Sequence, residues 1–136
     1  MSARPITLVE TTEDVLAFKR WLSEPRAALA VDTETEGLDW VRHKVRLVQL
    51  GDTREAWCIP AQWWLGAVRE ALAEYRGPLV MHNAKYDSHI LKSAGIDVPA
   101  AQVHDTMIMS HIIDPTGSHA LKSLASRILG ENSDAP

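Results

Sequence analysis

Apolar and polar positions follow two alternating patterns along this chain. Apolar residues recur at helical spacing in five segments, and these are predicted to be helices: residues 11–22, 62–75, 85–94, 107–113 and 120–129. A glycine or proline stands at most three residues after the end of each segment, and both residues commonly end helices. The pattern therefore predicts five helices with well-marked ends.

Short apolar runs between these segments predict strands. Residues 27–31 form a continuous apolar run, which is typical of a central strand buried on both faces. Residues 45–50 and 55–60 are two further candidates, and Gly-Asp-Thr-Arg at 51–54 favours a hairpin turn between them. We therefore expect these three strands to form an antiparallel meander.

A buried apolar strand at residues 79–81 and a short extended piece at residues 103–105 alternate with the later predicted helices. A meander followed by such alternating units indicates an α/β fold, in which a mixed sheet carries helices on both faces. No internal repeat or linker divides residues 1–136. We therefore expect a single domain.

Composition narrows the class of protein. Of the 136 residues, 46% are hydrophobic and 24% charged, as in an ordinary globular domain, and the single cysteine, Cys58, excludes an internal disulfide. No apolar run approaches the ~20 residues of a membrane span, and no signal peptide begins the chain, so a cytoplasmic protein is expected. The net charge of −4 argues against nucleic-acid binding through bulk positive charge, although it is compatible with a cation-dependent nuclease.

Two carboxylates stand at the end of the most apolar predicted strand. Asp32 and Glu34 are two positions apart, so their side chains point to the same face of the sheet. Two neighbouring carboxylates repel each other unless a cation neutralises them, which favours a divalent metal site. Hydration of a frayed strand end explains the same spacing, and both interpretations remain open at this point.

A second polar pair begins the predicted helix at residues 85–94. Asn83 and Asp87 are four positions apart and share a face, and Asp87 precedes Ile90 and Leu91 at the spacing that faces inward. A carboxylate on that side needs a partner. The common alternative is an acidic residue that the helix dipole favours in the first turn.

Taken together, these residues resemble a known family. The sequence VDTETEGLD at 31–39 resembles exonuclease motif I, and HNAKYD at 82–87 resembles motif II, of the proofreading 3′-5′ exonuclease domain in family A (polymerase I type) DNA polymerases. Residues 104–125 are similar to the segment that links motif II to motif III. The resemblance runs from about Leu8 to Gly130, and it implies the ribonuclease H-like fold of the DEDD exonuclease superfamily.

The resemblance also implies a chemistry and a site. It implies two-metal hydrolysis of phosphodiesters at single-stranded or frayed 3′ DNA ends, with Mg²⁺ or Mn²⁺ as cofactor. Asp32, Glu34 and Asp87 are implied as the catalytic metal ligands, and we expect them to converge at the edge of the central strand. The implied substrate-binding residues are Thr35, Leu38 and Asn83.

One family feature is not found in residues 120–136. The fourth carboxylate of the family lies in a Tyr-x-x-x-Asp or His-x-x-x-x-Asp motif, whereas the late acids here are Glu131 and Asp134, and no Tyr or His stands near them. We therefore expect the N-terminal portion of an exonuclease domain, C-terminally truncated, with a polymerase domain in the same or another chain as a partner.

Two other functions remain open. One is a ribonuclease D-like or Werner-type exonuclease that acts on RNA or structured DNA. The other is a catalytically inactive module that binds DNA ends or a polymerase, because the fourth carboxylate is missing.

Other residues carry weaker indications. The basic patch at 42–46 either contacts phosphates or is a solvated hairpin, Trp40 is a candidate for base stacking, and Asp105 is predicted to cap a helix.

Overall fold

Six strands form one sheet in the order β1-β4-β3-β2-β5-β6 in the computed structural model of this chain, which describes residues 4–131. The strands are β1 (Ile6–Leu8), β2 (Leu29–Thr35), β3 (Val45–Gly51), β4 (Ala56–Pro60), β5 (Leu79–Met81) and β6 (Val103–Asp105). Strands β2, β3 and β4 pair antiparallel, and β5 and β6 extend the sheet in parallel, which confirms the predicted mixed sheet. The short strand β1, parallel to β4, was not predicted. Asp134 lies outside the described residues.

The helices begin and end close to the predicted residues. They are α1 (Thr12–Ser23), α2 (Ala61–Glu74), α3 (Ala84–Ser93), α4 (Thr106–Ile113) and α5 (Leu121–Leu124), with a 3₁₀ turn at Ala100–Gln102 and a π-helical turn at Ala125–Leu129. The predicted helix at 120–129 is therefore divided into two short pieces. Within residues 4–131, no helix is both long and apolar enough to cross a membrane.

The core lies on one face of the sheet. Alternate residues of β2, namely Leu29, Val31 and Thr33, are buried, and the hydrophobic core combines this face with side chains of α1, α2 and α3. On the other face of β2, the side chains of Ala30, Asp32 and Glu34 are exposed. The prediction that this strand is buried on both faces is therefore wrong, and the described residues place no helix over that face of β2.

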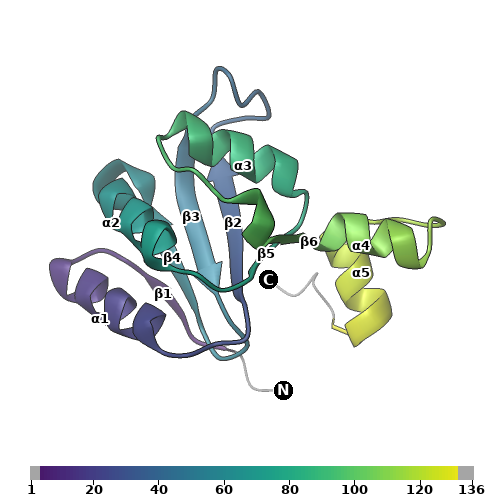
Figure 1. The fold of residues 1–136 in the computed structure, drawn as a ribbon, viewed down its shortest axis with the longest axis horizontal. Helices are drawn as coiled ribbons and strands as arrows, with labels where there is room; N and C mark the ends of the chain where they lie inside the picture. The colour runs from purple at the N-terminus through teal and green to yellow at the C-terminus, as the bar shows by residue number, and fades with distance from the viewer. Residues whose placement is uncertain (1–3, 132–136) are drawn as a thin grey trace.

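Helices α4 and α5 lie beside the sheet, beyond β6 (Figure 1). Their exposed apolar side chains are Ile108, Met109, Ile112, Ile113 and Leu121, and Ile128 and Leu129 follow in the π-helical turn. Among residues 4–131, the last hydrophobic residue that packs against the main core is Val103 of β6. The sheet and helices α1 to α3 therefore form the packed body that carries motifs I and II.

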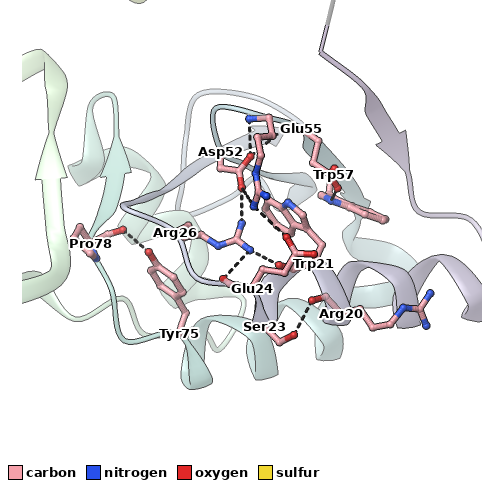
Figure 2. Close-up of polar contacts among 11 residues, drawn as sticks. Arg20, Trp21, Ser23, Glu24, Arg26, Asp52, Glu55, Trp57, Tyr75 and Pro78 are labelled. Atoms are coloured by element: carbon pink, nitrogen blue, oxygen red, sulfur yellow. Dashed lines mark hydrogen bonds and ion pairs between the residues drawn. The ribbon is translucent and has the colours of Figure 1, made fainter.

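A buried ion pair holds the loop before β2 to the β3–β4 hairpin (Figure 2). Arg26 Nη1 lies 2.9 Å from Asp52 Oδ2, and the two side chains are only 3% and 6% exposed. The guanidinium of Arg26 lies over the Trp21 ring, 4.0 Å from its centroid, and donates to the Trp21 carbonyl. Asp52 also accepts from the backbone N–H groups of Arg54 (2.8 Å) and Glu55 (3.1 Å). These contacts join the start of β2 to the neighbouring hairpin.

Candidate active site

The candidate active site lies at the C-terminal end of β2, where motif I runs through the strand itself. Asp32 and Glu34 both project from the exposed face of β2, as their spacing predicted. They pair across the sheet with Gln49 and Leu47 of β3 in a regular ladder, and the register shifts only between Glu34 and Thr35. Regular pairing up to this point means that the two carboxylates share one rigid surface.

Asp87 reaches the same strand from the first turn of α3. Its side chain is only 3% exposed, so the predicted inward orientation is confirmed. Thr33 Oγ1 donates a hydrogen bond to Asp87 Oδ1 at 2.5 Å. Thr33 was missed in the sequence, although alternation with Asp32 places it on the buried face, where a polar residue needs a partner.

The charge of Asp87 is poorly compensated. Burial raises the pKa of this carboxyl to about 6; the hydrogen bond from Thr33 opposes the rise, whereas the negative charge of Asp32 adds to it. No Lys, Arg or His among residues 4–131 forms an ion pair with Asp87. A buried acid without a cation beside it is destabilising when ionised.

The three carboxylates do not form one compact cluster. Within the described part of the chain, no three His, Cys, Asp or Glu side chains are grouped closely enough to hold a metal ion. The physical reason lies in the strand: Asp32 and Glu34 project from its exposed face, whereas Asp87 bonds to Thr33 on its buried face. The expected convergence is therefore incomplete, although the charge of Asp32 still raises the pKa of Asp87.

The donor chemistry nevertheless fits a hard divalent cation. Carboxylate oxygens are the ligands that Mg²⁺ and Mn²⁺ prefer. A cation near Asp32 and Asp87 would also offset the repulsion and the burial that raise the pKa of Asp87. The donor atoms of these residues are thus of the type that a divalent cation prefers, and Glu34 lies on the exposed face with Asp32.

The turn after β2 is held by hydroxyl groups. Thr35 Oγ1 donates to the Gly37 carbonyl at 2.7 Å, and Tyr86 Oη donates to the same carbonyl at 2.9 Å. The two hydroxyls lie 2.8 Å apart. A Cβ at residue 37 would approach the His43 ring to 2.7 Å, so a side chain there would have to displace that ring. Tyr86, whose role the sequence did not reveal, therefore ties motif II to motif I.

The three predicted substrate-binding residues differ in whether their side chains are available to contact a ligand. The Thr35 hydroxyl is engaged within the protein by the bond to Gly37, whereas the Leu38 side chain is 89% exposed just beyond that turn. Asn83 is exposed and precedes α3 with a left-handed backbone, φ 65° and ψ 56°. Leu38 and Asn83 are thus accessible at the same end of the sheet as Asp32.

Trp40 and the basic patch border this end of the sheet. The Trp40 ring stacks on His89 of α3, with 4.3 Å between centroids. Residues 40–45 line a cavity of about 360 Å³ together with parts of α2 and α3. A neighbouring cavity of about 810 Å³ is lined by Glu34, Lys44 and Arg46, among others. Basic side chains therefore line the same cavity as one of the candidate carboxylates.

Comparison with known proteins identifies the family. A family model for the 3′-5′ exonuclease of family A DNA polymerases matches residues 6–135. The DNA polymerase of Mycobacterium phage L5 is 32% identical over 141 residues, covering 93% of this chain and 24% of that protein. DNA polymerase I of Synechocystis sp. is 32% identical over 137 residues, covering 90% and 14%. The chain belongs to the 3′-5′ exonuclease domain family of these polymerases, and it spans less than a quarter of the length of these curated relatives.

Solved nuclease structures share the fold. Escherichia coli RNase D superposes with a TM-score of 0.75 at 18% identity, covering 95% of this chain and 34% of that one. Brucella melitensis NrnC with bound Mg²⁺ superposes with a TM-score of 0.71 at 23% identity, covering 100% and 66%. These similarities confirm the predicted ribonuclease H-like α/β fold.

Proposed function

We propose that this chain acts as the 3′-5′ proofreading exonuclease domain of a DNA polymerase I-like protein and hydrolyses phosphodiesters at DNA 3′ ends. Asp32, Glu34 and Asp87 are the proposed ligands of two Mg²⁺ or Mn²⁺ ions. The observation that carries the proposal is the environment of Asp87, a buried carboxylate that faces Thr33, lies within the field of Asp32 and has no cationic partner among the described residues. Such uncompensated, perturbed acids concentrate at functional sites.

Each nearby residue has a definable task in this proposal. Divalent ions, when bound, would lower the pKa of a water and neutralise charge on the phosphate. Thr33 fixes the rotamer of Asp87 through its hydroxyl. Thr35 and Tyr86 fix the Gly37 turn. That turn presents the exposed Leu38 to the terminal nucleotide.

Asn83 is proposed to hold the same nucleotide, because its side chain makes no capping bond to α3 and is exposed. The proposed partner molecule is a single-stranded or frayed 3′ DNA end. A polymerase domain in the same or another chain is the proposed protein partner.

The test is degradation of a 5′-labelled single-stranded DNA in Mn²⁺. Asp32→Asn should abolish the cleavage ladder, whereas the matched control Asp97→Asn, at an exposed acid outside the site, should leave it unchanged. Because residues 120–136 hold no fourth-carboxylate motif, we expect this chain to be slower than a family member with that motif by roughly a hundred- to ten-thousandfold. A ladder that persists in Asp32→Asn would refute the proposal.

A second candidate is a module that binds DNA ends without cleaving them. It is favoured by the lack of a compact three-carboxylate group among residues 4–131. Retention of the labelled DNA with no cleavage, even at high protein concentration in Mn²⁺, would support this alternative. A labelled RNA of the same sequence, run in parallel, tests the ribonuclease D-like activity.

A further inference from the structure

The junction between β6 and α4 contacts motif II directly. Asp105 caps α4, as predicted, because its Oδ1 accepts from the backbone N–H groups of Met107 (2.9 Å) and Ile108 (3.3 Å). The same carboxylate also accepts from the backbone N–H of Asn83 at 3.2 Å and, through Oδ2, from that of Ala84 at 2.8 Å. The second pair of bonds adds nothing to the cap of α4, so it requires another explanation.

Asn83 has a backbone conformation that needs support from neighbouring groups. Among the described residues, it is the only non-glycine with a positive φ, and its own side chain forms no capping hydrogen bond. The left-handed conformation is unfavourable for residues with a Cβ and persists only where the surroundings impose it. The bond from its backbone N–H to Asp105 is a contact that can impose it.

The residue before Asn83 is held by the same junction. His82 Nδ1 lies 2.9 Å from Thr106 Oγ1, and His82 Nε2 donates to the carbonyl of His119 at 2.8 Å. Residues 82–84 are therefore attached one after another to Asp105 and Thr106. Asp87 follows in the first turn of α3, so the direction in which this helix leaves the turn determines where its carboxylate lies.

We propose that Asp105 is a positioning residue: by holding Asn83 in its left-handed conformation, it fixes the direction of α3 and so the position of the Asp87 carboxylate relative to Asp32 for cation binding. This inference rests on the proposed function, because the cation site is part of that proposal. Asp105 itself is not a ligand in this scheme, since both of its carboxylate oxygens already accept backbone N–H groups.

The central variant is Asp105→Ser in the 136-residue chain, with Mn²⁺ alone as the probe. Serine is a good N-cap and retains the bond to the start of α4, but it is too short to reach the N–H groups of Asn83 and Ala84. Free Mn²⁺ is measured by electron paramagnetic resonance under conditions where every variant is fully folded, so that a change in stability alone does not alter the result. We expect the dissociation constant to rise about tenfold, as for other residues that orient metal ligands.

The matched control is Asp14→Ser. Asp14 also accepts two backbone N–H groups at a helix start, those of Glu10 (2.9 Å) and Thr11 (3.0 Å), but it does so at α1. This variant should bind Mn²⁺ as tightly as the wild type. A tenfold loss in both variants would show a general effect of removing a cap and would overturn the inference.

A rescue experiment tests the proposed cause. Glycine adopts a positive φ without the steric cost of a Cβ, so Asn83→Gly, added to Asp105→Ser, should recover most of the lost Mn²⁺ affinity. If Asp105→Ser does not fold, Asp105→Asn serves instead, because it has the same shape but puts an amide N–H where one acceptor oxygen stands.

Three results would overturn the inference: wild-type affinity in the Asp105 variants, no rescue by Asn83→Gly, or an affinity loss equal to that of the α1 control. A different result marks failure of the proposed function. If the wild type binds no Mn²⁺ that Asp32→Asn removes, the proposed cation site is absent, and the role given to Asp105 fails with it.

Discussion

A buried aspartate lies near each end of β2, and the two are in opposite electrostatic environments. At the start of the strand, Asp52 lies 2.9 Å from the buried guanidinium of Arg26. At the other end, Asp87 has the hydroxyl of Thr33 as its hydrogen-bond donor and the negative Asp32 nearby. Burial alone would raise the pKa of Asp52, but backbone donors and the charge of Arg26 outweigh it and lower the pKa. The pKa of Asp87 is raised to about 6.

The difference shows that burial of a carboxylate supports the fold only where its charge is compensated. At the start of β2, the ion pair of Arg26 and Asp52 joins α1 and β2 to the β3–β4 hairpin, and each buried charge has a partner of opposite sign. The Asp87 end retains repulsion between acids, which a divalent cation would remove. Sites that depart from the rules of stable packing in this way are commonly the functional ones.

The two aspartates also give opposite dependences on pH. Asp87 has a folded pKa above the unfolded value of about 3.9, so the folded protein binds its proton more tightly, and stability falls as pH rises from about 4 to about 6. Asp52 has a lowered folded pKa, so its contribution is present above about pH 4 and is lost as pH falls through the folded value.

The largest effect on stability is expected from removing the Arg26–Asp52 ion pair at the start of β2. Asp52→Ala leaves Arg26 buried without its partner, and loss of one member of a buried pair costs about 3–5 kcal/mol in the free energy of unfolding. Urea denaturation at pH 7.5 in EDTA measures it, with Asp97→Ala as an exposed control that should change little. A loss below about 1 kcal/mol would mean that Arg26 does not compensate Asp52.

The next largest effect is the stabilisation that Mn²⁺ should give at the C-terminal end of β2. Mn²⁺ at a hundredfold excess over its dissociation constant should stabilise the wild type by about 2.7 kcal/mol, because the ion binds the folded site and not the unfolded chain. Asp32→Asn and Asp87→Asn should each remove most of this gain, whereas Asp52→Asn should retain it. Melting temperatures with and without Mn²⁺ measure the gain, and its persistence in Asp32→Asn would place the ion elsewhere.

Removing the uncompensated charge should stabilise the metal-free protein. Asp87→Asn keeps an oxygen that accepts from Thr33 and carries no charge, so at pH 7.5 in EDTA it should raise the free energy of unfolding by about 2 kcal/mol. The difference from the wild type should shrink towards pH 4, where the wild-type carboxyl is protonated. A variant less stable than the wild type at pH 7.5 would contradict this electrostatic interpretation.

The smallest effect is expected from removing a tyrosine hydroxyl. One such hydroxyl lies near each end of β2. Tyr75 Oη donates to the Pro78 carbonyl at 3.1 Å, and Tyr86 Oη donates to the Gly37 carbonyl at 2.9 Å. Tyr75→Phe and Tyr86→Phe should each cost about 1 kcal/mol. Amide hydrogen exchange should quicken over residues 36–44 in Tyr86→Phe alone. Equal exchange in both variants would show that Tyr86 does not hold this turn.

The sequence by itself determined most elements of the fold and the shared face of Asp32 and Glu34. Helical periodicity, glycine and proline at helix ends and two-residue alternation in strands are local properties, so four of the predicted helices begin and end within one residue of the observed bounds. The cap at Asp105 is local in the same sense, because it lies directly before α4. The β1 strand was not predicted: its apolar residues Ile6 and Leu8 are exposed, and its place in the sheet is set by its pairing with β4.

Tertiary structure decided which face of β2 is covered and how its acids are paired. The run at 27–31 alternates alanine with Leu29 and Val31, and only the packing of α1 to α3 shows that the alanine side is open. The Thr33–Asp87 bond joins residues 54 apart, and the Arg26–Asp52 pair joins residues 26 apart. Both contacts depend on which strands and loops become neighbours in the folded sheet. Spacing along the chain does not contain that information, because it is set by long-range packing of the core.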